Sequence, residues 1–442
     1  MGVPGGATGS TATGRPHRAV ATVILVVFLD LVGFGIVLPI LPYYVRSFGV
    51  GDVFIGLLAA TYSLTQFLAT PVLGRYSDRW GRRPVIVFSL AGSAVAWTVF
   101  GLADLTGERG GAAVGVATLF VARALAGAMG GNIAAAQAYV ADVTPADRRA
   151  GALGLVGAAF SLGFIFGPAI GGALASDWAL RAASALAIPA TRFSLPAFGA
   201  AAMSLVALGV ALVALAEPDR RRTAGDRTTL VGTFVAALRD PSLRGLVLAF
   251  FLVSVAFAGV QVMFIPFVAD APAYRFDASA AALLLTYVGV LGALNQGLLV
   301  GRLADRFGSA RLAVGGAATV LVALAALPFA PELGRLLPAV GPGWLTPELV
   351  ALLCVLGLLS LGNGLLNPSL AALVSTSADA DRQGTAFGVT QGAGSLGRTV
   401  GPPVAAALYA LAYWSPFVAG AAVVLPVVAL LLGVVRRGDA AA

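Results

Sequence analysis

Two charged segments decide the fold: GRYSDRWGRR at positions 74–83 and GRLADRFGSAR at positions 301–311. Each directly follows an apolar run of about 20 residues, the length that spans a lipid bilayer as a helix. A second pair of patterns also repeats, SLGFIFGP at 161–168 and SLGRTVGP at 395–402. The chain is therefore predicted to consist of two similar halves, each built from membrane-spanning helices.

The composition is typical of a membrane protein. The chain has 442 residues, of which 59% are hydrophobic and 11% are charged, whereas a soluble protein carries about 25% charged residues. A chain this apolar cannot cover a water-facing surface, which argues against a soluble enzyme. The single His and single Cys argue against a His-based metal site, a disulfide framework and a His-containing catalytic triad. We therefore expect no cofactor and no metal.

The apolar runs predict twelve transmembrane helices, and hence an all-α membrane protein with two pseudo-symmetric six-helix bundles. The predicted spans are 19–45, 53–73, 84–104, 113–140, 150–175, 194–216, 245–268, 279–300, 311–330, 348–373, 384–410 and 413–435.

The predicted organisation has five parts. They are a disordered cytoplasmic tail at 1–18, an N-terminal bundle at 19–216, a cytoplasmic linker at 217–244, a C-terminal bundle at 245–435 and a cytoplasmic tail at 436–442. Within the linker, Leu230, Phe234, Ala237 and Leu238 have helical spacing, which predicts a short interfacial helix.

The distribution of the basic residues predicts the orientation. Of the 28 basic residues, all arginine, twenty lie in the two tails and in the segments that follow even-numbered spans, and six lie on the opposite side. By the positive-inside rule both termini are cytoplasmic. The same distribution accounts for the net charge of +8 without a nucleic-acid partner. We expect a multi-pass protein of the inner (cytoplasmic) membrane whose partners are the lipid bilayer, a small-molecule substrate and protons.

These motifs resemble those of the major facilitator superfamily, and within it the twelve-helix drug/proton antiporters, including the tetracycline exporters. The segment 74–83 is similar to the signature between helices 2 and 3, and the stretch from Arg123 to Gly131 is similar to the helix-4 motif. The stretch from Asp30 to Pro42 is similar to the helix-1 motif of the tetracycline exporters. The resemblance covers all twelve spans and implies a monomeric secondary transporter. The helix-5 antiporter signature is matched by Gly163, Gly167, Pro168, Gly171 and Gly172.

Two embedded charged residues are the candidates for proton coupling. Asp30 lies about 10 residues into the first span, or roughly 15 Å deep at 1.5 Å per residue. A charge at the bilayer centre costs about 2.5–3.5 kcal/mol on insertion scales, so burial favours the protonated carboxyl, which can carry a proton. Arg123 stays charged and is expected to face the cavity or a carboxylate; the resemblance implies that it tunes Asp30. The alternatives are a purely structural carboxyl and an Arg that reaches the membrane interface.

Polar residues within the spans predict the lining of a substrate cavity. Arg398 shares a helix face with Gln391 and Ser395, and it is expected to contact an anionic or polar substrate group or to form a gating pair; the alternative is a packing hydrogen bond to backbone carbonyls. The aromatic candidates are Phe34, Phe164, Phe257 and Phe264. The other candidates, for each of which helix packing is the alternative, are Gln66, Asn132, Gln137, Gln261, Asn295, Gln296, Asn363 and Asn367.

The repeated charged segments are predicted to gate the cytoplasmic end. Asp78 can accept hydrogen bonds from Arg82, and Asp142 is expected to join them; the resemblance implies that this cluster latches an outward-open state. The other members are Gly74, Arg79, Gly81, Gly301, Asp305 and Arg306. The glycines of the helix-5 signature predict close helix packing, and the resemblance adds that they seal the central path against ion leak.

Together these features predict proton-coupled export of a hydrophobic, cationic or neutral drug-like compound by alternating access. The sequence has no Gly-x4-Gly-Lys-Ser/Thr motif and no Lys, which argues against ATP as the energy source. From 271 onward every acidic residue falls in a loop, a tail or a span end, whereas the tetracycline exporters use acidic groups within their second half, so tetracycline itself is not favoured. The alternatives are a proton-coupled carrier of a metabolite (a sugar, a siderophore or an organic anion) and a non-transporting scaffold or lipid scramblase.

Overall fold

The computed structural model describes residues 14–145, 148–186, 190–218, 239–240, 243–339, 342–377 and 383–441. All secondary structure in these residues is helical, because inside a bilayer each backbone group must find its partner within the same segment. Eleven helical stretches of the described chain are long and apolar enough to cross a membrane. The remaining predicted span, α18 (Gln383–Leu411), has 29 residues, but polar side chains interrupt its apolar sequence.

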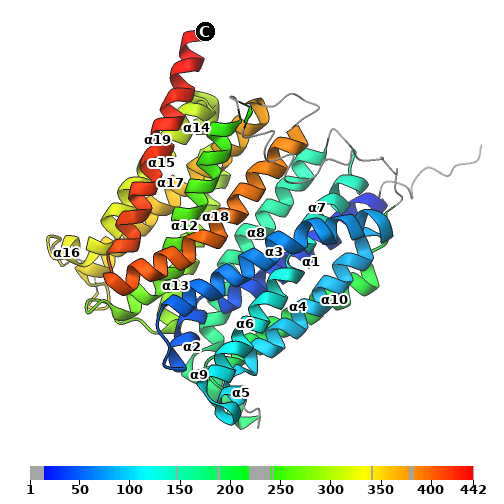
Figure 1. The fold of residues 1–442 in the computed structure, drawn as a ribbon, viewed down its shortest axis with the longest axis vertical. Coiled ribbons are helices and arrows are strands. Elements are labelled where there is room, and N and C mark those ends of the chain that lie inside the picture. Colours follow the sequence, from blue (N-terminus) through cyan, green and yellow to red (C-terminus); the bar gives the residue numbers. More distant parts are fainter. Residues whose placement is uncertain are drawn as a thin grey trace, which may run out of the picture.

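The first half is built from long helices joined by short ones (Figure 1). The long helices are α1 (Gly14–Val37), α3 (Val53–Trp80), α4 (Arg82–Gly101), α6 (Ala112–Met129), α7 (Asn132–Val143), α8 (Arg149–Leu174) and α10 (Ser194–Ala214). The short helices are α2 (Leu41–Ser47), α5 (Ala103–Gly110) and α9 (Asp177–Ala185). These three short helices lie together at one end of the molecule, which we call the α2 end.

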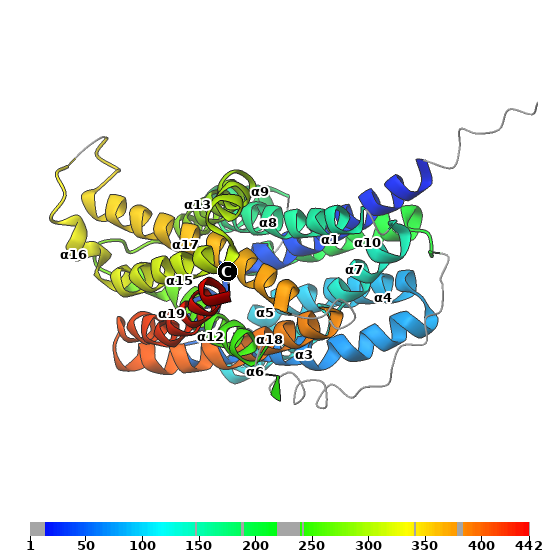
Figure 2. The ribbon, with the colours of Figure 1, turned by 90° about the horizontal axis from the view of Figure 1, so that it is seen from above.

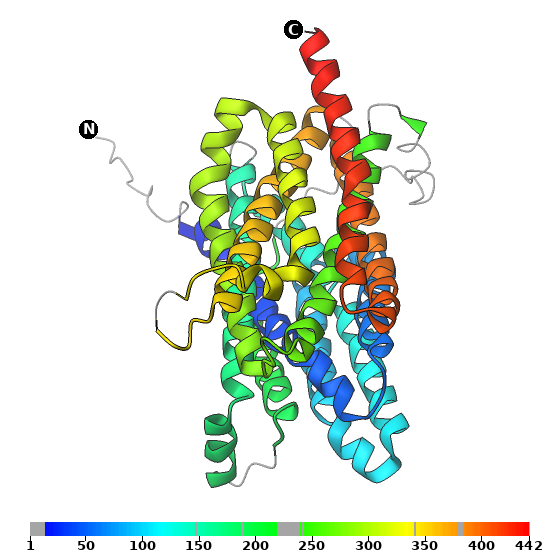
Figure 3. The same cartoon turned by 90° about the vertical axis from the view of Figure 1, so that its left-hand side faces the viewer.

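The second half repeats this design. It contains α12 (Arg244–Asp270), α13 (Ala278–Leu294), the π-helix η1 (Asn295–Val300), α14 (Gly301–Phe307), α15 (Ser309–Ala326), the 3-10 helix η2 (Leu327–Phe329), α16 (Ala330–Gly334), α17 (Pro347–Ser377), α18 and α19 (Ser415–Ala441). The start of α1 and the end of α19 lie at the end opposite α2 (Figure 3).

Several predicted spans differ from the observed helices. The span 19–45 is two helices, because Pro39 and Pro42 follow α1 and Pro lacks the N–H that a continuous helix needs. The span 113–140 is also divided, at Gly130 and Gly131 between α6 and α7. Helix α1 begins at Gly14, within the segment expected to be a tail, and the interfacial helix expected near Phe234 lies outside the described residues.

The charged segments 74–83 and 301–311 were predicted to lie between spans, but most of each segment is helical. Helix α3 continues to Trp80, and the helical stretch after α13 continues to Phe307. The turns come only at Gly81, with φ 130°, and at Gly308, with φ 77°. A residue with a side chain is strained at these angles, so the repeated glycine marks the true turn in each half. We call this end of the molecule the Gly81 end.

The two halves stand side by side (Figure 2). Across their boundary α8 packs against α13, and α3 packs against α18. Within each half a matching pair of helices touches through glycine. A Cβ on Gly167 of α8 would lie 2.5 Å from Cα of Gly35 on α1, and one on Gly401 of α18 would lie 2.3 Å from the carbonyl oxygen of Val255 on α12. This repeated packing is the structural basis of the internal repeat.

Candidate functional site

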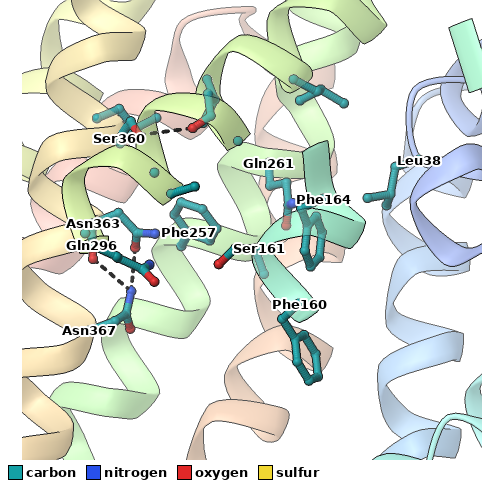
Figure 4. Close-up of a pocket in the computed structure, with 18 of the residues that line it drawn as sticks. Leu38, Phe160, Ser161, Phe164, Phe257, Gln261, Gln296, Ser360, Asn363 and Asn367 are labelled. Carbon is teal, nitrogen blue, oxygen red and sulfur yellow. Dashed lines mark hydrogen bonds between the residues drawn. The ribbon is translucent and has the colours of Figure 1, made fainter. Parts of the chain in front are cut away.

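A cavity of about 400 Å³ lies between the halves, a volume suited to a drug-sized compound. Its walls come from the C-terminal end of α1, from α8 and, in the second half, from α12, α13, η1, α17 and α18. Figure 4 shows Leu38 on one side and the amide side chains of α17 and η1 on the other. The lining residues used below are Leu38, Phe160, Ser161, Phe164, Ser254, Phe257, Gln261, Leu285, Gln296, Ser360, Asn363, Asn367 and Arg398.

Aromatic and amide side chains both line the cavity. Phe160 and Phe164 come from α8 of the first half, and Phe257 comes from α12 of the second, where it lies near Asn363 and Gln296 (Figure 4). On α17, the amide nitrogen Nδ2 of Asn367 donates a hydrogen bond to Oδ1 of Asn363 at 2.6 Å. The site therefore combines an apolar surface with a cluster of polar groups.

Two adjacent amides at η1 differ in their placement. Gln296 lines the cavity, whereas Asn295 is not among the lining residues. Its Cβ lies 3.4 Å from the position that a Cβ on Gly364 of α17 would take, so Asn295 packs against the edge of the cavity wall. The π-helix is a local irregularity of the kind that is frequent at functional sites.

Arg398 is the one charged residue in the described lining. Its Nη2 atom donates a hydrogen bond to Oγ of Ser395, one turn earlier on α18, at 2.9 Å. No carboxylate lies within 4.0 Å of it in the described part of the chain. The arginine is exposed, so its charge is presented to the cavity rather than neutralised by an ion pair.

Asp30 lies outside the cavity lining, on α1, where it meets α7. Nδ2 of Asn132 donates a hydrogen bond to Oδ2 of Asp30 at 3.0 Å. Asn132 is the first residue of α7 and is only 5% exposed, so the break at Gly131 places this amide beside the carboxyl. Within the described residues, the buried Oδ1 atom of Asn132 has no hydrogen-bond partner.

Arg123 contacts aromatic rings rather than a carboxylate. Its side chain is 4% exposed, and its guanidinium carbon lies 4.6 Å from the ring centre of Tyr62 and 5.8 Å from that of Phe34. Stacking over an aromatic face is a favourable position for a guanidinium. In the described residues no ion pair joins Arg123 to Asp30, and Arg123 faces aromatic rings rather than the cavity lining. Sequence reasoning missed Tyr62, whose ring lies beneath the guanidinium.

Five of the predicted lining residues line the cavity: Gln261, Gln296, Asn363, Asn367 and Arg398. Phe164 and Phe257 also line it. The others do not. Three of them pack within one half: Gln66 donates to the carbonyl oxygen of Gly130, Phe34 packs on Tyr62, and Phe264 is buried in the core. Gln137 and Gln391 are exposed outside the cavity, and Asn132 is held by Asp30.

The charged cluster of the first half surrounds Arg82 at the Gly81 end. The Nε atom of Arg82 lies 2.8 Å from Oδ2 of Asp142, and its Nη1 atom pairs with Asp78, one turn earlier. Glu217, at the end of the first half, accepts hydrogen bonds from the backbone N–H groups of Arg82 and Arg83 at 2.8 and 2.9 Å. Sequence reasoning missed this carboxylate, which caps the positive N-terminal end of α4.

The matching segment of the second half is arranged differently. Gly301 begins α14, and Asp305 and Arg306 are exposed on it. The guanidinium of Arg306 lies 5.4 Å from the ring centre of the adjacent Phe307. On α3, Arg79 is exposed and Gly74 is partly buried. At the position that matches Arg82 the second half has Ser309, so it cannot form the same ion pairs there.

The helix-5 glycines contact both halves. Cβ atoms on Gly163, Gly167 and Gly171 would each lie within 2.6 Å of an atom of α1. A Cβ on Gly172, at the α2 end, would lie 2.6 Å from Cβ of Ala282 on α13. The signature thus packs α8 on its own half and also brings the two halves together.

An ion-pair cluster joins the halves at the α2 end. Arg46 of α2 binds Asp52 at 2.7 Å and Asp270, at the end of α12, also at 2.7 Å. The hydroxyl of Tyr409 donates to Asp270 at 2.9 Å, and that of Tyr43 donates to the carbonyl oxygen of Phe276 at 2.6 Å. Burial alone would lower the pKa of the Arg46 guanidinium, but its hydrogen bonds to both carboxylates outweigh this and raise the pKa. From the sequence, Arg46 was expected only to be one of the six basic residues on the side opposite the cytoplasm.

The sequence matches the profile of the Major Facilitator Superfamily over residues 23–389. The chain belongs to this superfamily. It is 29% identical to tetracycline resistance protein, class C, of Escherichia coli over 434 residues, or 96% of this chain and 98% of that protein. It is 28% identical to multidrug resistance protein 1 of Bacillus subtilis (strain 168), over 88% of this chain and 89% of that protein.

The fold has solved relatives in the same superfamily. The crystal structure of the human organic anion transporter MFSD10 (TETRAN) superposes with a TM-score of 0.64 at 25% identity, covering 94% of this chain and 99% of that one. The protein is therefore a multi-pass membrane transporter of the major facilitator fold, not an enzyme, and the resemblance to the tetracycline exporters is confirmed.

Proposed function

We propose that this protein exports a lipophilic compound across the inner membrane in exchange for protons, by alternating access. The central cavity would hold the compound, and Asp30 would carry the proton. The single observation that carries the proposal is the placement of Asp30. It is the one acidic residue well inside a span, beside the cavity rather than in it, and it is held by the amide of Asn132 at 3.0 Å.

This position suits a proton carrier because the substrate and the proton would then have separate sites, joined by packed side chains. Arg123 stacks on Tyr62 at 4.6 Å, and Phe34 packs between Tyr62 and Phe164, with ring centres 5.0 and 6.2 Å apart. Phe164 lines the cavity, as does Arg398. A rearrangement of these packed rings would therefore reach the cavity, which gives coupled exchange a contiguous path.

The contacts at the α2 end support alternating access. Arg46, Asp270 and the tight approach of Gly172 to Ala282 close that end. With both termini in the cytoplasm, as the arginine distribution favours, the closed end is the external one, and the cavity is reached from inside the cell. Export would then require this ion-pair cluster to open while the Gly81 end closes.

The relatives support export and a lipophilic substrate. Their names refer to tetracycline resistance, multidrug resistance and organic anion transport, and each of these classes includes compounds with a large apolar part. The cavity has no acidic lining residue in the described chain, which gives a metal–tetracycline chelate no carboxylate to bind there. We therefore propose a lipophilic organic compound and not tetracycline itself.

The test uses inside-out vesicles with an acidic interior and a dye that reports lumenal protons. A panel of lipophilic drugs is added to wild type, Asp30→Asn and Glu108→Gln, the last being a matched loss of an exposed carboxylate on α5. We expect drug-triggered proton efflux from wild type and Glu108→Gln, and none from Asp30→Asn. Efflux that persists in Asp30→Asn would remove Asp30 from the proton path. No efflux with any drug would favour a metabolite carrier instead.

A further inference from the structure

We propose that the transported compound is an amphiphile with a single acidic group, and that Arg398 is the residue that binds this group. This inference rests on the proposed function, since it names the substrate class of the same cavity. It departs from the cationic or neutral compound that the sequence favoured, and develops the anionic contact that the sequence left open for Arg398.

The charge of the cavity carries the argument. Arg398 is the one charged residue in the described lining, and no carboxylate lies within 4.0 Å of it in that part of the chain. Asp30, the embedded carboxylate, is hydrogen-bonded to Asn132 and does not line the cavity. A cationic compound would enter beside a like charge with no counter-ion, whereas an anion would supply the missing partner.

Hydrogen-bond donors extend this preference. A guanidinium has five N–H donors, and the one recorded hydrogen bond, to Ser395, uses one of them. On the facing helix, Oδ1 of Asn363 already accepts a hydrogen bond from Asn367, so its own amide N–H groups remain available as donors. Arg398 thus keeps unused N–H donors in the cavity lining, and their fork geometry fits the paired oxygens of a carboxylate or sulfonate.

The rest of the lining requires an apolar body on the same compound. Phe160, Phe164 and Phe257 supply aromatic surface, and Leu38 and Leu285 add aliphatic surface. The volume of about 400 Å³ lies in the range of pockets for drug-sized ligands. A small hydrophilic anion would leave this surface unfilled, so the acid must be attached to a lipophilic skeleton.

Three radiolabelled probes with one naphthalene body test the proposal: naphthaleneacetate, naphthaleneacetamide and naphthylmethylamine. Proton-driven accumulation is measured in inside-out vesicles and corrected with Asp30→Asn vesicles, which report passive entry. The variants are Arg398→Gln, Arg398→Lys and Arg335→Gln, the last removing an exposed positive charge that does not line the cavity.

We expect wild type and Arg335→Gln to carry the acid about tenfold faster than the amide or the amine, since a charge-assisted contact of this kind changes affinity by about that factor. Arg398→Gln should lower carriage of the acid to the level of the amide and leave the amide unchanged, which also shows that the variant is folded. Arg398→Lys should recover part of the preference, because it keeps the charge but not the guanidinium geometry.

The inference fails if the amine is carried as fast as the acid, or if Arg398→Gln leaves carriage of the acid unchanged. It also fails if no probe is carried by a protein that moves protons in response to neutral drugs. In each of these cases proton-coupled export itself would stand. If neither drugs nor probes move protons, the proposed function fails.

Discussion

At the scale of single residues, we expect transport to depend strongly on the contact between Arg123 and Tyr62. Tyr62→Leu removes the ring beneath the guanidinium, a contact worth about 0.5–2 kcal/mol, and leaves the buried charge with only the more distant ring of Phe34. Tyr62→Phe keeps the ring and is the matched control. We expect transport to fall strongly in Tyr62→Leu and to persist in Tyr62→Phe, measured as substrate-driven proton flux. Equal loss in both variants would show that the hydroxyl, not the ring, is required.

Asp104 gives a prediction about pH, since it lies on α5 outside the spans. Burial raises the pKa of its carboxyl, and the hydrogen bond from Thr191 only partly offsets this. A folded-state pKa above the unfolded value stabilises the protein below the unfolded pKa of about 3.9, and this stabilisation is lost as pH rises through the folded pKa. The melting temperature of wild type relative to Asp104→Asn should therefore fall as the pH rises above about 4. Asp305→Asn, which removes an exposed carboxylate on α14, is the control, and a difference that rises with pH would contradict the account.

At the scale of elements, the glycines of α8 divide into those that touch a neighbouring helix and those that do not. A Cβ on Gly167 would meet Cα of Gly35 at 2.5 Å, whereas nothing lies within 4 Å of one on Gly157. Gly167→Ala should lower stability in detergent by about 1–3 kcal/mol through overpacking. Gly157→Ala should be neutral or slightly stabilising, since Ala favours a helix over Gly. Similar melting curves for the two variants would rule out this packing.

The elements also show what sequence could predict. The spans were predictable because apolar length follows directly from bilayer thickness, and the internal repeat followed from the motifs around Asp78 and Asp305. The lining residues Gln261 on α12 and Asn363 and Asn367 on α17 could be predicted, because large polar side chains are rare in these apolar helices. The π-helix at Asn295 and the pairing of Arg46 with Asp270 were not predictable, since both depend on contacts between distant segments.

At the scale of the whole molecule, the ion-pair cluster at the α2 end is expected to set how often that end opens. Arg46→Gln removes a partly exposed pair with Asp270, worth about 1 kcal/mol, which corresponds to about a fivefold shift in population. In a Cys354→Ser background with Ser161→Cys as cavity reporter, labelling by an impermeant maleimide in whole cells should rise by about that factor.

The control is Arg192→Gln, which breaks an exposed ion pair with Asp177 inside the first half. It should leave labelling at the wild-type level. Equal labelling of wild type and Arg46→Gln would show that the α2 end is held closed by other contacts, such as that between Gly172 and Ala282.

Coupled exchange requires that binding of the compound release the proton held by Asp30, and this can be measured on the purified transporter without a membrane gradient. In weakly buffered detergent solution near neutral pH, a soluble indicator reports protons released when a compound that drives proton flux in vesicles is added. We predict release of about one proton per bound compound from wild type and none from Asp30→Asn. Equal release by both proteins, or binding without release in wild type, would contradict the account.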